Sequence, residues 1–270
     1  MRIAVDHTTH YVFSGPVSRG LQRLRLMPKT SSGQRVIQWN MSFEGAHLQV
    51  EYEDPNCNHV SLISFDPGAS EVTIRCEGLI DTNDESGIIG RHSGFMPMWQ
   101  FLEQTDLTRV GPRARSLLTG LPSEANTLTS LHNLSALIRD RVEYAAGHTD
   151  SATTAEGVLA AGRGVCQDHA HVFIGAARAL GIPARYVSGY LMMDDRIEQD
   201  AGHAWAEAHV EGLGWVGFDI SNGISPDARY VRVATGRDYK DAAPITGIRY
   251  GARDEAMHVK LAVEQHHVQQ

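Results

Sequence analysis

The sequence predicts an α+β protein in which an N-terminal antiparallel β domain precedes a larger region of helices and strands. Over the first 80 residues, short segments alternate apolar and polar residues, the period of half-exposed strands. From about residue 98, apolar residues recur at spacings of three or four, which indicates helices before strands return at residue 184. With 270 residues, 42% hydrophobic and 21% charged, the chain is predicted to be globular, with about two domains.

The first domain is predicted to be an antiparallel meander or small sandwich over residues 1–80. Its strand candidates are residues 21–29, 35–43, 48–53, 59–65 and 70–78. The segments SSGQ, EGAH, EDPNCN and DPGAS separate them and supply the residues that tight turns require. Residues 81–97 are polar and glycine-rich, so we expect a linker there. Residues 98–270 then form the second domain, which on this reading includes the C-terminal strands.

The second domain is predicted to begin with helices and to continue with strands. Helical periodicity is strongest over residues 124–146 and 166–180, after weaker segments at 98–105 and 113–121. Gly181 is placed just past the second long helix, where a left-handed residue commonly ends a helix. Strands are predicted over residues 184–193, 203–210 and 214–221, with shorter pieces including 230–234 and 258–263.

Composition excludes several classes of function. A formal net charge of -8 and a pI near 5.9 argue against binding nucleic acid or anionic lipid. No apolar run approaches the roughly 20 residues of a membrane span, and MRIAVDHTTHYVF does not resemble a secretory signal. Three scattered cysteines are an odd count, which favours free thiols over disulfides. We therefore expect a cytoplasmic protein, and the sequence is silent on its oligomeric state.

Cys166 stands apart from the other two cysteines. Cys57 falls in a turn and Cys76 in a strand, where a cysteine is usually an inert small residue. Cys166 follows the segment GRGV and opens a predicted helix, so its sulfur would lie at the helix N-terminus. The unpaired N–H groups and the positive end of the helix dipole favour a thiolate there.

A thiolate nucleophile needs a base, and the base needs an orienting partner. His203 begins a predicted strand, and Asp219 lies sixteen residues later on the next one. Residues on one face of a strand alternate, so both side chains share a face only if the intervening turn is odd in length or contains a bulge. An even turn in regular pairing would separate His203 from Asp219.

Two stretches resemble a known family. The run GRGVCQDHAHVFIGAARALGIPARYVSGYL (162–191), followed by GHAWAEAHVEGLGWVGFDISNG (202–223), is similar to the core of bacterial transglutaminase-like cysteine enzymes. Residues 144–164 resemble the segment that precedes the cysteine in those proteins. HTTHYVFSGPV and LRLMPK resemble the family's bacterial N-terminal region, and residues 231–251 resemble its closing stretch.

The resemblance implies a papain-like core in which the cysteine helix packs on an antiparallel sheet. It also implies Cys166 as the nucleophile, His203 as the general base and Asp219 as the carboxylate that orients the base. The family commonly has proline after this aspartate, whereas Ile220 stands here, which puts only the local backbone in doubt. The backbone N–H of Cys166 is a natural oxyanion donor, and the second donor is unassigned.

The implied function is attack on an amide or peptide carbonyl to form a thioester. A hydrolase, meaning a cysteine protease or amidase, is the favoured interpretation, and protein-glutamine acyl transfer is the first alternative. A non-catalytic binding module that retains the fold is the second. The expected partner is a protein or peptide substrate, with no cofactor, metal, nucleic acid or membrane.

Other residues near the motif have competing interpretations. Cys166, His169 and His203 could hold zinc, but a structural site needs four ligands. Asp168, His169 and His171 are expected to be structural. Two aromatic residues, Trp205 and Trp215, either wall a cleft or are buried in the sheet. The acidic segment 194–200 is expected to be a surface loop, with a lid or a preference for basic substrates as the alternative.

Overall fold

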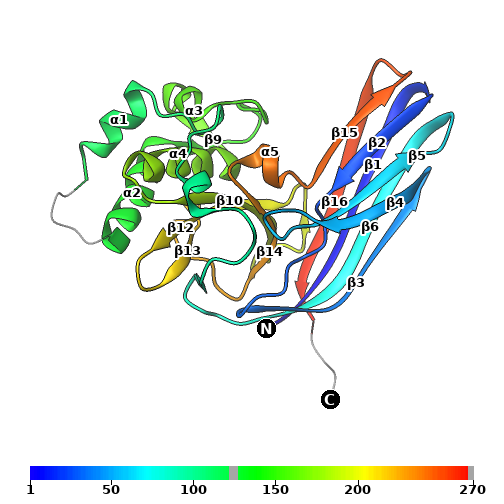
Figure 1. The fold of residues 1–270 in the computed structure, drawn as a ribbon. Coiled ribbons are helices and arrows are strands. Elements are labelled where there is room, and N and C mark those ends of the chain that lie inside the picture. The colour runs from blue at the N-terminus through cyan, green and yellow to red at the C-terminus, as the bar shows by residue number, and fades with distance from the viewer. Residues whose placement is uncertain (122–126, 267–270) are drawn as a thin grey trace.

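The computed structural model describes residues 1–121 and 127–266, and it has an α+β fold built from a β sandwich and a mixed core (Figure 1). Almost all strand pairs are antiparallel, as predicted. No helix within the described ranges is both long and apolar enough to cross a membrane.

Two sheets of the sandwich pack face to face. One has the order β11-β16-β1-β6-β3 and the other β15-β2-β5-β4. The inward side chains of both sheets form one apolar cluster that includes Phe13, Ile63 and Ile74. The main strands of the sandwich are β1 (Arg2–Val17), β2 (Arg19–Leu24), β3 (Gln34–Glu44), β4 (Ala46–Glu53), β5 (His59–Phe65), β6 (Ala69–Thr82), β15 (Ile245–Tyr250) and β16 (Glu255–Gln265).

The core has a five-stranded sheet of order β14-β10-β12-β13-β7, with helices on one side (Figure 1). Its strands are β7 (Ile88–Gly90), β10 (Ala184–Leu191), β12 (His203–Val210), β13 (Gly214–Phe218) and β14 (Tyr230–Gly236). Its helical elements are η1 (Met98–Phe101), α1 (Pro112–Leu118), α2 (Thr127–Arg141), α3 (Ala155–Ala161), α4 (Cys166–Ala179) and α5 (Tyr239–Ala242). The short strands β8 (Glu143–Tyr144) and β9 (Arg163–Gly164) pair in parallel, and β11 spans Glu198–Gln199.

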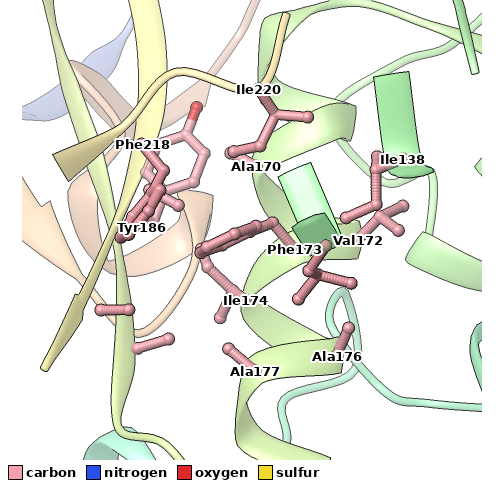
Figure 2. Packing of buried hydrophobic residues seen from close by; sticks show 14 of the residues in the cluster. Ile138, Ala170, Val172, Phe173, Ile174, Ala176, Ala177, Tyr186, Phe218 and Ile220 are labelled. Atoms are coloured by element: carbon pink, nitrogen blue, oxygen red, sulfur yellow. The ribbon is translucent and has the colours of Figure 1, made fainter. Parts of the chain in front are cut away.

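Helix α4 lies at the centre of the core because it is apolar on most of its surface. Ala204, Ala206 and Ala208 of β12 present small side chains to the same cluster, which lets the helix approach the sheet closely. Figure 2 shows Phe173 and Ile174 of α4 directed toward the strands, while Val172 lies near Ile138 of α2. Gly181 has φ of 77°, so the left-handed residue predicted after the helix is confirmed.

Two segments differ from the sequence-based division of the chain. The C-terminal strands β15 and β16 hydrogen-bond to β2 and β1, so they belong to the sandwich. The prediction from the sequence that they belong to the second domain is wrong. Within the predicted linker 81–97, β7 pairs with β13 and forms an edge of the core sheet. The pairing of two strands that are distant along the chain produces no local sequence pattern. The sequence therefore did not reveal which strands β7, β15 and β16 pair with.

The sandwich and the core share a buried apolar cluster. Ile3 and Ile80 of the sandwich pack with Tyr190 and Val231 of the core, and Leu261 of β16 joins them. The two units are therefore held together by side chains from both ends and the middle of the chain.

Candidate active site

The N-terminus of α4 is held by a buried carboxylate. Asp168 Oδ2 accepts hydrogen bonds from the Val165 backbone N–H at 2.8 Å and from the Thr149 hydroxyl at 2.6 Å. Val165 is extended, with φ of -106°, so the chain turns sharply into the helix at Cys166. The thiol of Cys166 is half-buried at this first turn. The structural role expected for Asp168 agrees with these contacts.

His169 also anchors this turn. Its Nδ1 lies 2.9 Å from the Val165 carbonyl oxygen and its Nε2 lies 3.0 Å from that of Val142. With both ring nitrogens against backbone carbonyls, His169 has neither free for a metal, so the zinc alternative loses one of its three ligands. His171, two residues further along, is also buried, and its Nε2 accepts from the Tyr239 backbone N–H at 3.1 Å.

The hairpin of β12 and β13 brings His203 and Asp219 to one face. Its turn is residues 211–213, an odd number, and Glu207 pairs with Gly217 in regular register. The geometric condition set by strand alternation is therefore met. His203 Nε2 lies 2.6 Å from Asp219 Oδ2, with both side chains nearly inaccessible to solvent.

Asp219 has further hydrogen-bond donors around its carboxylate. Oδ2 accepts from the Tyr230 hydroxyl and from the Asn222 side-chain amide, each at 2.7 Å, and Oδ1 accepts from the Ser221 hydroxyl at 2.7 Å. Such bonds stabilise the ionised form of a buried carboxylate. Ile220, which stands where the family commonly has proline, is buried beside Ala170, so the backbone after Asp219 is supported by core packing (Figure 2).

The charges of this group are strongly coupled. Burial alone would lower the pKa of His203, but its hydrogen bonds to Asp219 and Cys166 outweigh burial and raise that pKa to about 10. Burial alone would raise the pKa of Asp219, but the contact with His203 and its other hydrogen bonds place it well below the usual range. Because Nε2 of His203 contacts Asp219, Nδ1 is the ring nitrogen available to contact the Cys166 thiol.

A pocket of about 620 Å³ opens beside His203. Its wall includes Tyr144, Met193, Asn222 and Tyr230, together with His203, which also contacts Cys166. The acidic residues at its rim are paired, Asp194 with Arg229 at 3.1 Å and Asp195 with Arg196 at 3.2 Å. Among the described residues, both acidic side chains of this rim are therefore paired with arginines, which does not favour a preference for basic substrates.

The acidic loop and the two tryptophans are held in place. Glu198 and Gln199 form β11, which pairs with β16, so the loop is tied to the sandwich. Trp205 is buried, with its ring centroid 6.2 Å from that of His203. Trp215 is fully buried and donates to His92 Nδ1 at 3.1 Å. Both tryptophans are therefore buried sheet aromatics, and Trp205 packs against His203 and Tyr230.

Comparison with known proteins agrees with this architecture. Residues 115–220, which include Cys166, His203 and Asp219, match the family model of the transglutaminase-like superfamily. Residues 3–81 match the model of the bacterial transglutaminase-like N-terminal region. Residues 115–220 thus belong to the transglutaminase-like superfamily.

Similar chains are found among mycobacterial proteins and solved structures. An uncharacterized protein of Mycobacterium leprae is 26% identical over 268 residues, covering 93% of this chain and 94% of the relative. An uncharacterized protein of Mycobacterium tuberculosis is 28% identical over 275 residues, covering 92% and 88%. The crystal structure of a protein named putative cysteine protease, from Cytophaga hutchinsonii, superposes with a TM-score of 0.78 at 21% identity, covering 100% and 92%. At that identity the likeness is one of fold.

Several residues that support the transglutaminase-like site were not singled out from the sequence. Ser221 and Asn222 lie two and three residues after Asp219, and a polar SNG turn after a strand is a signal that could have identified them. Tyr230 lies on β14, a strand that reaches Asp219 only through the sheet, so no local pattern pointed to it. Thr149 likewise contacts Asp168 across nineteen residues.

Proposed function

We propose that the protein is a cysteine-nucleophile enzyme that hydrolyses amide or peptide bonds through a thioester. The strongest support for this proposal is the position of His203 between two partners. Its ring contacts the carboxylate of Asp219 and also the thiol of Cys166. A nucleophile, a base and an orienting carboxylate in mutual contact are the arrangement that covalent acyl transfer needs.

In the first half-reaction, the thiolate of Cys166, whose proton is held by His203, attacks the substrate carbonyl. Sγ bonds to the carbonyl carbon and the π electron pair moves to oxygen, where the free N–H groups at the start of α4 and its dipole stabilise the charge. When the intermediate collapses, the bond to nitrogen breaks and the leaving amine takes a proton from His203. A pKa near 10 keeps His203 protonated for this step at neutral pH.

In the second half-reaction, water resolves the thioester. His203, now neutral, accepts a proton from water as its oxygen bonds to the acyl carbon, and the thiolate leaves. Asp219 keeps the ring oriented throughout. An amine in place of water would give acyl transfer to a lysine, the chemistry of a transglutaminase. The pocket beside His203 is wide enough for part of a peptide, and a protein or peptide is the substrate class we propose.

The decisive experiment compares the parent with Cys166→Ala on peptide and isopeptide libraries read by mass. We expect the variant to lose at least about a thousandfold in rate, because the nucleophile is absent. Gain of water with cleavage of the chain indicates a protease, replacement of ammonia by water without cleavage indicates an amidase, and crosslinks formed with loss of ammonia indicate an acyltransferase. Cys57→Ala is the matched control and should stay within about twofold of the parent. A Cys166→Ala protein with full activity would contradict the proposal.

Alkylation with iodoacetamide separates an enzyme from a binding module. Burial raises the pKa of Cys76 to about 12, and burial with a hydrogen bond to Glu53 raises that of Cys57. Cys166 should therefore be labelled much faster than either at neutral pH, since the thiolate fraction controls the rate. Equally slow labelling of all three thiols would favour a non-catalytic module.

A further inference from the structure

A second cavity lies where loops of the sandwich meet the sandwich side of the core sheet. Its volume is about 520 Å³, and among the described residues it shares no wall residue with the pocket beside His203. Its walls come from the loop after β2, the turn between β4 and β5, the segment after β7, and strands β10 and β14. Four basic residues line it, namely Lys29, Arg91, Arg185 and Arg232.

Two of these basic side chains, Arg185 and Arg232, form ion pairs with the same carboxylate. Arg185 Nε lies 2.5 Å from Oε2 of Glu207, and Arg232 Nε lies 2.6 Å from its Oε1. Glu207 is fully buried, and its pKa lies near 2, because the two guanidinium groups outweigh the effect of burial. Both Nη atoms of Arg185 and Nη1 of Arg232 form no hydrogen bond with any residue that the structure describes, so these donors remain available.

Lys29 is a third basic group in this cavity. Its Nζ donates to the Asn56 carbonyl at 2.6 Å and to the Thr235 hydroxyl at 2.9 Å, and no carboxylate within residues 1–121 and 127–266 forms an ion pair with it. Burial, and then the nearby Arg232 and Arg185, hold the pKa of Lys29 well below its usual value.

The charges of the cavity are thus unbalanced. Arg185 and Arg232 carry two positive charges against the single negative charge of Glu207, and the Lys29 amine adds a third when it is protonated. Arg91 and Glu53, both exposed in the cavity wall, carry one charge of each sign. Cations held away from water without a counter-charge are unfavourable, and a bound anion relieves that penalty. Guanidinium groups present planar pairs of donors that match phosphate and carboxylate oxygens.

We propose that this cavity binds a doubly charged oxyanion, either a phosphoryl group or a dicarboxylate. Hydroxyl groups of Ser31, Ser32 and Ser93 line the same space and supply further donors. Because the walls belong to both units, the anion would contact the sandwich through Lys29 and the core through Arg185 and Arg232. The site is separate from the thiol chemistry and is independent of the proposed function.

The test is calorimetric titration of the full chain with inorganic phosphate and, separately, with succinate, using chloride at equal ionic strength as reference. We expect saturable binding of at least one dianion. Arg91→Glu reverses an exposed charge at the mouth and should weaken binding by about tenfold or more. Arg115→Glu is the matched control, since Arg115 is exposed on α1 away from the cavity, and it should change binding less than about twofold.

A second variant and a second readout keep the result clear. Lys29→Met removes the buried charge and should also weaken binding by about tenfold or more, while phosphate or succinate should slow modification of Lys29 by trinitrobenzenesulfonate in the parent. Binding of phosphate alone identifies a phosphoryl ligand, and binding of succinate alone identifies a dicarboxylate. Absence of binding by both, or binding that Arg91→Glu leaves unchanged, would overturn the proposal.

Discussion

At the scale of single residues, the surroundings of Asp219 determine the charge of His203. Tyr230, Ser221 and Asn222 keep the carboxylate ionised, and the ionised carboxylate keeps the imidazole protonated. A ring protonated at neutral pH can serve as an acid toward a leaving amine before it serves as a base toward water. In the proposed reaction, the donors around Asp219 would therefore act through His203 as positioning residues.

Asp219→Asn should lower the pKa of His203 by more than one unit, because the amide carries no charge to stabilise the imidazolium. NMR titration of the His203 ring measures this directly, with the parent expected to titrate near pH 10. Ser221→Ala is the milder control, since it removes one of several donors. An unchanged His203 titration in Asp219→Asn would contradict the coupling.

The same coupling affects stability. The pKa of folded His203 lies above the ordinary 6.5, so its contribution is complete below pH 6.5 and is lost as pH rises toward 10. Asp219 has the opposite sign, because its lowered pKa stabilises the fold above about pH 4 and the contribution is lost in acid. Urea unfolding of Asp219→Asn between pH 7 and 10 should therefore show a smaller decline in free energy than the parent.

At the scale of elements, helix α4 determines where the thiol lies. Buried Arg178 near its C-terminus donates to the carbonyl oxygens of Phe101, Ala184 and Arg237, which ties the helix to three other segments. Gly175 allows a close approach, because a Cβ there would lie 2.0 Å from the Thr108 carbonyl oxygen. Both contacts hold the helix axis, and through it Cys166, against the sheet.

Gly175→Ala should lower the free energy of unfolding by about 1–3 kcal/mol through overpacking, although alanine is the better helix former. The matched control is Gly157→Ala on α3, where the added methyl meets only ordinary contacts at 3.4 Å or more. That change should raise stability by up to about 1 kcal/mol. Urea unfolding of both variants checks the prediction, and similar effects of the two changes would refute it.

At the scale of the whole molecule, the shared cluster makes the sandwich and the core one folding unit. Leu261 and Val263 of β16 pack with Val5 of β1 and with Tyr190 and Val233 of the core. The C-terminal strand is thus needed by both units, although it comes after the core in the chain. Parting the two units would expose apolar side chains from each.

Leu261→Ala should lower the free energy of unfolding by about 2–5 kcal/mol, because it removes a fully buried side chain from this cluster. Met257→Ala, on the same strand but 56% exposed, should change it by less than about 0.5 kcal/mol. Unfolding followed by the fluorescence of Trp39, Trp205 and Trp215 should remain a single transition. Two separate transitions in the parent would show that the units unfold independently.

Sequence patterns predicted the parts of this protein that depend on neighbours along the chain. The start of α4 at Cys166, the left-handed Gly181 and the hairpin after His203 follow from helical spacing, turn residues and strand alternation, which are short-range properties. The resemblance of residues 162–191 and 202–223 to transglutaminase-like enzymes likewise lies in linear motifs. The folded chain confirms the α+β class, and the family models that match residues 3–81 and 115–220 confirm the resemblance.

Only the tertiary structure decided which distant segments meet. Strands β15 and β16 pair with strands at the start of the chain. The hydroxyl of Tyr230 donates to Asp219 on another strand. One cavity is lined by residues far apart in the chain, namely Lys29, Arg185 and Arg232. Long-range strand pairing has no local period, and the balance of buried charges depends on which side chains share a space. The sequence by itself therefore determined the elements and the family, whereas the folded chain determined the contacts that control charge.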